Sequence, residues 1–135
     1  ILQARTGSSR LPGKVLANLG GRPMLAFLVE RLKRCTSVDR IILATTKLKE
    51  DEALTALGRS LGLSIVRGSQ NDVLSRFVLA AKDTDASILV RITGDCPLVD
   101  PDLLDEMVQE FQNNNLKACI IILYCFNQRI PPICS

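Results

Sequence analysis

Basic side chains gather in one short segment near the start of the chain, RTGSSRLPGK at residues 5–14. Arg5, Arg10 and Lys14 all precede Glu30, which is the first acidic residue. Hydrogen bonds between such cations and phosphate oxygens contribute about 1.5–3 kcal/mol each, more than neutral pairs do. The clustering therefore predicts a local binding site for a polyanion such as a triphosphate.

The remaining residues of this segment suit the same ligand. Gly7 and Gly13 allow backbone N–H groups to point at an anion, and Ser8 and Ser9 add hydroxyl donors. The segment is not a Walker A loop, because Lys14 is not followed by Ser or Thr and we expect no helix to begin there. A solvated, flexible loop is the alternative that composition alone leaves open.

A second segment with suitable chemistry is RITGDCPLVDP at residues 91–101. Asp95 follows an expected strand, and Gly94 before it lets the backbone approach a ligand closely. Magnesium ions prefer oxygen ligands and usually combine one or two carboxylates with substrate phosphates. Asp95 is therefore our candidate ligand for Mg²⁺, and the alternative is a turn aspartate that hydrogen-bonds its own backbone.

The acidic residues after Asp95 are expected to serve the next helix. Asp100 stands directly before Pro101, which favours a helix N-cap. Asp102 and Asp105 then suit the positive end of the helix dipole.

A third segment, VRGSQNDVLSR, carries a weaker signal. Gly68 turns the chain after an expected strand, and Asp72 is placed to cap the following helix. Arg67, Ser69 and Gln70 offer donors and acceptors to a nucleobase. A capped helix start explains most of this pattern without any ligand.

Alternating strands and helices must position these segments. In chain order we expect a strand at 1–4, a helix at 23–34, a strand at 40–45, a helix at 50–61, a strand at 63–66, a helix at 72–82, a central strand at 87–92 and a helix from 100. In the helix at 72–82 we expect Leu74, Phe77, Val78 and Ala81 to face inward.

The alternation of strands and helices predicts an α/β fold with a parallel sheet covered by helices on both faces. Ligands of such sheets bind at the carboxyl ends of the strands, so the first two segments should open on one crevice.

Composition excludes several other classes of protein. The chain has 135 residues, of which 47% are hydrophobic, which suits one globular domain. A net charge of +3 is too small to indicate nucleic-acid binding, and no apolar run is long enough for a membrane span. Histidine is absent, which excludes Ser-His-Asp triads and His-ligated zinc. Five cysteines without a CxxC pattern indicate reduced thiols in a cytoplasmic protein, and a nucleophilic role for Cys96 is not favoured because no general base accompanies it.

Four ordered motifs carry a resemblance to a known family. QARTGSSRLPGK, GGRPML, RGSQNDVLSR and RITGDCPLVDP resemble the sugar cytidylyltransferases, the group that includes the CMP-Kdo and CMP-sialic acid synthetases. They are most similar to the branch called spore coat polysaccharide biosynthesis protein F, and the resemblance covers residues 1–111. It implies a Rossmann-like, three-layer nucleotidyltransferase fold with a mostly parallel sheet.

The resemblance also implies roles for individual residues in transferring a cytidylyl group from CTP to a sugar with release of pyrophosphate. Arg5 and Arg10 would hold the triphosphate beside the backbone of residues 7–9. Lys14 would offset charge at the α-phosphate and the leaving pyrophosphate, and Asp95 would bind Mg²⁺. These three basic residues are our candidate catalytic groups, because positioning and electrostatic stabilisation supply most of the catalysis of phosphoryl transfer.

The expected nucleoside contacts lie on other segments. Ala4 would contact the nucleoside through its backbone, and residues 67–72 would line the base pocket. The full set of candidate nucleotide-binding residues is Ala4, Arg5, Gly7, Ser8, Ser9, Arg67, Ser69, Asp72 and Gly94.

Chains of this family are about twice as long, so we expect the nucleotide half of a truncated fold here. We place that domain at residues 1–117 and an atypical tail at residues 118–135. Sugar contacts and the homodimer expected of the family would depend on the other half. The alternatives are a catalytically silent nucleotide-binding fragment, a transferase for another base or acceptor such as a cofactor guanylyltransferase, and a plain α/β interaction domain.

Overall fold

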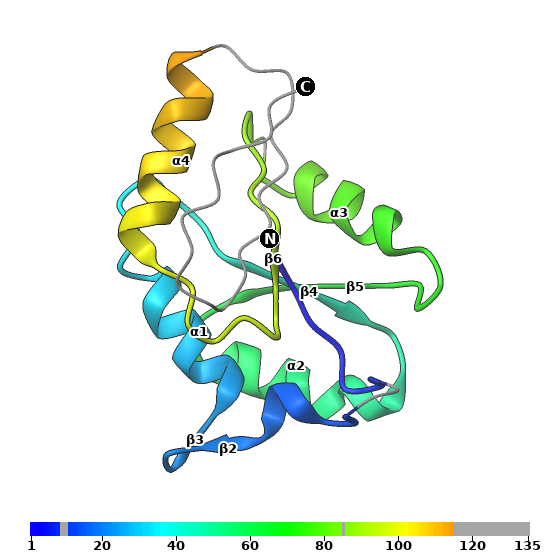
Figure 1. Cartoon of the computed structure of the whole chain (residues 1–135). Coiled ribbons are helices and arrows are strands. Elements are labelled where there is room, and N and C mark those ends of the chain that lie inside the picture. The colour runs from blue at the N-terminus through cyan, green and yellow to red at the C-terminus, as the bar shows by residue number, and fades with distance from the viewer. Residues whose placement is uncertain (9–10, 85, 115–135) are drawn as a thin grey trace.

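Parallel strands form the central sheet of the computed structural model, which describes residues 1–8, 11–84 and 86–114 (Figure 1). The first strand, β1 (Leu2–Gln3), pairs with β4 (Ile42–Thr46) on one side and with β6 (Ile92–Thr93) on the other. A fourth strand, β5 (Ser64–Gly68), pairs with β4, which gives the order β5-β4-β1-β6. All pairs in this sheet are parallel, so the strands share one carboxyl edge.

Helices cover both faces of this sheet. The helices are α1 (Met24–Leu32), α2 (Glu52–Ser60), α3 (Val73–Lys82) and α4 (Pro101–Asn113), with short 3-10 helices at η1 (Lys14–Leu16) and η2 (Lys49–Asp51). Helices α1 and α2 pack on one face and α3 on the other, as Figure 1 shows. The predicted three-layer α/β arrangement is confirmed. Among the described helices, none combines the length and the apolar character that a membrane crossing requires.

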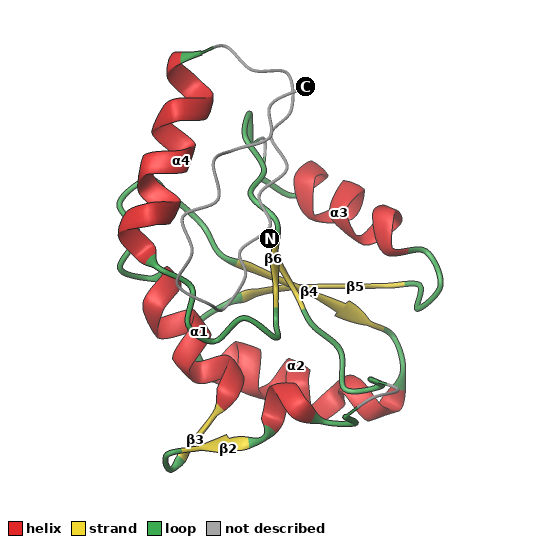
Figure 2. Cartoon of the chain, in the orientation of Figure 1, coloured by secondary structure: helices red, strands yellow, loops and turns green. Residues whose placement is uncertain are grey.

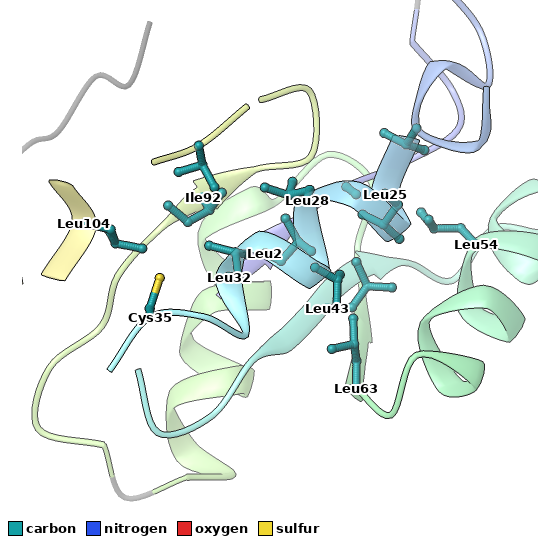
Figure 3. Packing of buried hydrophobic residues seen from close by; sticks show 14 residues of the cluster. Leu2, Leu25, Leu28, Leu32, Cys35, Leu43, Leu54, Leu63, Ile92 and Leu104 are labelled. Atoms are coloured by element: carbon teal, nitrogen blue, oxygen red, sulfur yellow. The ribbon is translucent and has the colours of Figure 1, made fainter. Parts of the chain in front are cut away.

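The main core lies between the sheet and helices α1 and α2. Leu2 is the register partner of both Leu43 and Ile92, so these side chains point to the same face. Figure 3 shows them in one cluster with Leu28 of α1 and Leu54 of α2. Burying a leucine side chain stabilises a fold by about 1.5–3 kcal/mol. Local apolar periodicity therefore predicted these helices to within about two residues at most ends.

A smaller core lies between the sheet and α3, and here the predicted helix face is wrong. Ile42 and Val66 pack against Ala80, which is fully buried. Leu74 and Val78, which we expected to be inward, are 72% and 45% exposed.

The inward face of α3 is set by a small residue and a glycine. Ala80 lets the helix approach the sheet closely, and Arg76 lies one turn earlier on the same stripe. A Cβ atom on Gly68 would lie only 2.7 Å from Cγ of Arg76, so the glycine makes room for the arginine stem. This pairing buries Arg76 to 2% exposure and turns the more apolar stripe outward.

The last strand is shorter than expected and lies at the edge of the described sheet. We predicted a central strand at 87–92, but β6 contains only Ile92–Thr93. Beside it, the nitrogen of Ile1 donates to the carbonyl oxygen of Val90 at 2.6 Å. The preceding residues do not extend the strand, and Leu89 is exposed.

A small hairpin precedes α1 and was not predicted. Strands β2 (Asn18–Leu19) and β3 (Arg22–Pro23) are antiparallel and joined by Gly20 and Gly21, whose φ angles are 59° and 90°. Two successive positive φ angles are typical of tight hairpin turns and favour glycine. Figure 2 shows the hairpin beyond α1 and α2, away from the main sheet.

Candidate nucleotide-binding site

The loop after β1 closes on one carbonyl oxygen. Thr6 O accepts hydrogen bonds from the backbone nitrogens of Ser8 and Gly13, both 2.8 Å long. Gly13 has a φ of 70°, and the 3-10 helix η1 begins at the next residue, Lys14. Our expectation that no helix begins there is therefore wrong, although this turn contains only three residues. Ser9 and Arg10, which we assigned to triphosphate binding, lie outside the described residues.

The start of this loop is anchored by Asp51, which our sequence analysis missed. Asp51 is the last residue of η2 and is fully buried. Its carboxylate accepts hydrogen bonds from the backbone nitrogen and the hydroxyl of Thr6, each 2.7 Å long. It also accepts hydrogen bonds from the hydroxyls of Thr45 and Thr46 at the end of β4. The carboxylate thus joins the loop after β1 to the neighbouring strand.

The electrostatics of Asp51 favour its charged form. Burial alone would raise the pKa of Asp51, but the hydrogen bonds from Thr46 and Thr6 outweigh burial and hold it below its ordinary value. The contact with Thr6 could not be predicted from a local motif, because 45 residues separate the two in the sequence. The only local signal is an acidic residue just before a helix.

Two other candidate residues, Arg5 and Gly7, lie near the start of the loop. Arg5 is exposed. Gly7 lies against Glu50, and a Cβ atom at Gly7 would come within 2.5 Å of its Oε1 atom. Any side chain at position 7 would therefore require Glu50 to move.

The first and second candidate segments meet at Lys14 and Asp95. The Lys14 Nζ atom lies 2.7 Å from Asp95 Oδ2, although 81 residues separate them. Hydrogen bonds from Lys14 and Thr93 hold the pKa of Asp95 below its ordinary value. The two side chains are 29% and 45% exposed, and ion pairs this accessible contribute at most about 1 kcal/mol to stability. The two segments therefore meet at one edge of the sheet, as expected, whereas a crevice there and the chemical roles of both residues stay predictions.

Close backbone packing brings these two segments together. Gly94 N donates to the carbonyl oxygen of Gln3 at 2.7 Å. A Cβ atom on Gly94 would lie 2.7 Å from the Cβ of Ala4, which is 6% exposed. Glycine at position 94 is thus required by the approach of β6 to β1.

The third segment forms a capped helix start, as expected. The Ser69 hydroxyl accepts from the backbone nitrogens of Asn71 and Asp72 at 3.2 Å. Asp72 caps α3 by accepting from Ser75 N at 2.9 Å. The predicted contacts of Ser69 and Asp72 with a base stay predictions.

Arg67 is held on the opposite side of this strand end. Its guanidinium donates to the carbonyl oxygens of Thr46 and Leu48 at 2.9 and 3.0 Å, and to Glu52 Oε1 at 2.6 Å. These bonds tie β5 to η2 and α2. Its predicted contact with the base is not tested by this arrangement.

The acidic residues after Asp95 divide into two roles. Asp100 is the predicted N-cap of α4 and accepts from Asp102 N at 3.0 Å. Asp105 does not only serve the helix dipole, because it accepts from the backbone nitrogens of Thr36 and Ser37 at 2.7 and 2.9 Å. These bonds lower the pKa of Asp105 to about 2 and attach α4 to the loop after α1.

Comparison with known protein families shows which family the chain belongs to. A family model described as cytidylyltransferase matches residues 1–125. The chain belongs to the cytidylyltransferase family. This assignment confirms the resemblance that the four sequence motifs indicated.

Two relatives of this member of the cytidylyltransferase family show how similar their sequences are to this chain. An uncharacterised protein of Methanocaldococcus jannaschii is 50% identical over 115 residues, which are 85% of this chain and 47% of the relative. The spore coat polysaccharide biosynthesis protein SpsF of Bacillus subtilis is 42% identical over 113 residues, or 81% of this chain and 47% of that protein. The chain thus spans about half the length of the curated relatives it matches.

Solved structures of cytidylyltransferases have the same fold. One from Leptospira borgpetersenii is 42% identical and superposes with a TM-score of 0.80 over 84% of this chain and 48% of its own. A CMP:2-keto-3-deoxy-manno-octonic acid synthetase complexed with CTP is 27% identical, with a TM-score of 0.71 over 84% of this chain and 46% of its own. The Rossmann-like fold expected from the motifs is therefore confirmed.

Proposed function

We propose that this protein is a nucleotidyltransferase that moves the cytidylyl group of CTP onto an acidic or phosphorylated sugar and releases pyrophosphate. Membership of the cytidylyltransferase family supports the reaction type. The relatives named for polysaccharide biosynthesis and for a CTP complex support the donor and the class of acceptor. We place the reaction in the cytoplasm on cysteine composition alone, and the homodimer stays a family expectation.

One observation carries this proposal: the contact between Lys14 and Asp95 at the carboxyl ends of β1 and β6. An exposed pair of this kind contributes little to stability, so the fold does not depend on it. A cation beside a carboxylate at this edge of the sheet is suited to a phosphate chain and its counterion. The loop that begins at this edge is closed by the carbonyl oxygen of Thr6, which accepts the N–H groups of Ser8 and Gly13, so these two backbone groups are not the ones that would meet a phosphate.

The transfer reaction requires little covalent chemistry from the protein. An oxygen of the acceptor forms a bond to the α-phosphorus while the bond from that phosphorus to the bridging oxygen breaks, and pyrophosphate leaves with the electron pair. Lys14 offsets the negative charge that develops on the phosphoryl and leaving oxygens. Arg5 and Arg10 hold the β- and γ-phosphates in line with the attacking oxygen.

The residues present fit a magnesium ion that depends on the nucleotide. Within the described ranges, no group of three or more acidic or thiol side chains forms a closed metal cage. Asp95 supplies one carboxylate, of which Oδ2 faces Lys14. Mg²⁺ commonly takes one or two carboxylates and completes its shell with phosphate oxygens and water. A bound Mg²⁺ would neutralise phosphate charge there, with Asp95 as its protein ligand.

Calorimetry of this chain with CTP, UTP, GTP and ATP, with and without Mg²⁺, tests the proposal. We expect CTP to bind best and its affinity to rise when Mg²⁺ is present. A second assay measures pyrophosphate release with CTP and a panel of sugar acids and sugar phosphates. Binding without release by any acceptor would favour the silent nucleotide-binding alternative, and absence of any triphosphate binding would refute the proposed site.

A further inference from the structure

Two successive turns carry Asp95 between β6 and α4. Cys96 N donates to the carbonyl oxygen of Thr93, and Val99 N donates to that of Cys96, both at 3.3 Å. Asp95 lies inside the first turn and Pro97 inside the second, where the fixed φ of proline suits the position. We call the segment from Thr93 to Val99 the double turn. The position of Asp95 depends on how the two ends of this segment are held.

The sheet holds the first end of the double turn. Thr93 is the register partner of Gln3 in β1. The nitrogen of the next residue, Gly94, donates to the carbonyl oxygen of Gln3 at 2.7 Å. Regular strand pairing is therefore enough to fix this end.

The second end of the double turn is a buried carbonyl group at Val99, which is 3% exposed. Helix α4 begins at Pro101, which has no N–H to donate. The helical hydrogen-bond pattern opens one residue after Val99, where Asp100 O accepts from Leu104 N at 3.1 Å. The carbonyl oxygen of Val99 lies outside this pattern, and a buried carbonyl group requires a donor from elsewhere.

Arg31 of α1 supplies that donor. Its Nε atom donates to the carbonyl oxygen of Val99 at 2.5 Å, although 68 residues separate them. Arg31 lies in the last turn of α1, where any cation suits the helix dipole, but the dipole does not require the side chain to reach a loop. None of the ion pairs found among the described residues includes Arg31. The bond to Val99 is thus the printed interaction that gives this side chain its direction.

The bond from Arg31 adds something that apolar packing of Val99 does not. The Val99 side chain belongs to the main core, and this packing fixes its place. Apolar packing has no preferred direction, whereas a hydrogen bond to a carbonyl oxygen has one. The end of α1 lies beside the start of α4 (Figure 1), so a short bridge between them is enough. Arg31 therefore orients the peptide group that closes the double turn.

We propose that Arg31 is a positioning residue for the magnesium site, because it holds the double turn and thereby directs the carboxylate of Asp95. This inference rests on the proposed function, in which Asp95 is the protein ligand of Mg²⁺. Asp95 also meets Lys14 Nζ at 2.7 Å, so a shift of the double turn would separate this pair too. Groups that orient a metal ligand from outside the coordination shell change metal affinity by about 10–100-fold.

Calorimetry of CTP binding with and without Mg²⁺ tests this role. The ratio of the two CTP affinities is the Mg²⁺ enhancement, which we expect to be at least about tenfold in the unmodified chain. Arg31→Met keeps the length of the side chain but removes its donors, and should reduce the enhancement at least about fivefold. Arg31→Lys supplies one donor group again and should recover part of it. Arg34→Met, at an exposed position just after α1, is the matched control and should leave the enhancement unchanged.

Amide hydrogen exchange gives a second measurement that needs no ligand. In Arg31→Met the amides of Cys96 and Val99 should exchange faster, because the double turn has lost the support of one end. Exchange in β4 should stay slow, which shows that the variant is folded. Where Arg31→Met also loosens β4, Arg31→Lys decides in its place: a reduced Mg²⁺ enhancement supports the role, and an unchanged one overturns it.

The outcomes separate this inference from the proposed function. Faster exchange at Val99 with an unchanged Mg²⁺ enhancement would limit Arg31 to a structural role, which overturns the inference and leaves the proposed function intact. CTP binding that does not respond to Mg²⁺ in the unmodified chain also overturns the inference, but it retains CTP as the ligand. Failure of the unmodified chain to bind CTP under either condition overturns the proposed function together with the inference.

Discussion

The Oδ1 atom of Asp51 accepts two hydrogen bonds from Thr6, one from its backbone nitrogen and one from its hydroxyl, each 2.7 Å long. Thr6 in turn accepts the backbone hydrogen bonds that close the loop at Ser8 and Gly13. The shape of the loop after β1 therefore depends on a carboxylate that is fully buried. Asp51 is a positioning residue.

Asp51→Asn tests this dependence. The amide presents a donor toward groups that already donate, so we expect unfolding to become easier by about 2–4 kcal/mol and CTP affinity to fall. Urea denaturation and calorimetry measure the two effects. Asp83→Asn is the control, since Asp83 is exposed at the end of α3. Unchanged stability in Asp51→Asn would contradict the assigned role.

The contact between Lys14 and Asp95 predicts a different combination of effects. Because the pair is partly exposed, Lys14→Ala and Asp95→Asn should each change the free energy of unfolding by less than about 1 kcal/mol. Both should weaken binding of CTP with Mg²⁺ at least about tenfold. Only Asp95→Asn should remove the increase in affinity that Mg²⁺ confers. Strong destabilisation by either substitution would assign the pair to the fold instead of the site.

The hydrogen bonds of Asp105 predict that the stability of the protein depends on pH in the acidic range. Its hydrogen bonds from Thr36 and Ser37 lower its pKa from 3.8 to about 2 in the folded protein. A lowered carboxyl pKa stabilises the fold above the unfolded value and loses that contribution as the pH falls toward the folded value. The stability difference between the unmodified chain and Asp105→Asn should thus be constant above about pH 5 and shrink between pH 4 and 2.

Urea unfolding at a series of pH values measures this difference. Glu106→Gln, on an exposed neighbouring position of α4, is the control and should show no such trend. A difference that stays constant down to pH 2 would show that the Asp105 contacts do not depend on its charge.

Gly94 predicts a steric coupling between β1 and β6. In Gly94→Ala the new Cβ would meet the Cβ of Ala4 at 2.7 Å and the carbonyl oxygen of Gln3 at 3.2 Å. We expect this overpacking to cost about 1–3 kcal/mol. Adding Ala4→Gly should recover part of the loss, because it removes the nearer of the two atoms. A double-mutant cycle by chemical denaturation gives the coupling, and purely additive effects would refute the contact.

Local patterns in the sequence predicted the parts of the fold that depend on local interactions. The apolar stripe of α1 and the caps at Asp72 and Asp100 follow from residues within a few positions of one another. The meeting of Lys14 with Asp95 followed from a topological rule, since both come after strands of one parallel sheet.

The failures share a different cause, because each depended on a contact between distant parts of the chain. The inward face of α3 was decided by Gly68 on β5, and β6 pairs with β1, which is 90 residues away in the sequence. Asp51 escaped notice because its partner Thr6 is far away in the sequence. The burial of Arg76 was not predicted either, because arginine is seldom fully buried.

The position of β1 has a consequence for the order of events during protein synthesis. This strand precedes the other strands of the described sheet in the sequence, yet it lies between β4 and β6, which begin 40 and 90 residues later. As the chain leaves the ribosome, β1 can pair within the described sheet only after β4 has been made, and Lys14 cannot meet Asp95 until residue 95 has emerged. A nascent chain should therefore acquire CTP binding late and in one step, after residue 95 has cleared the exit tunnel.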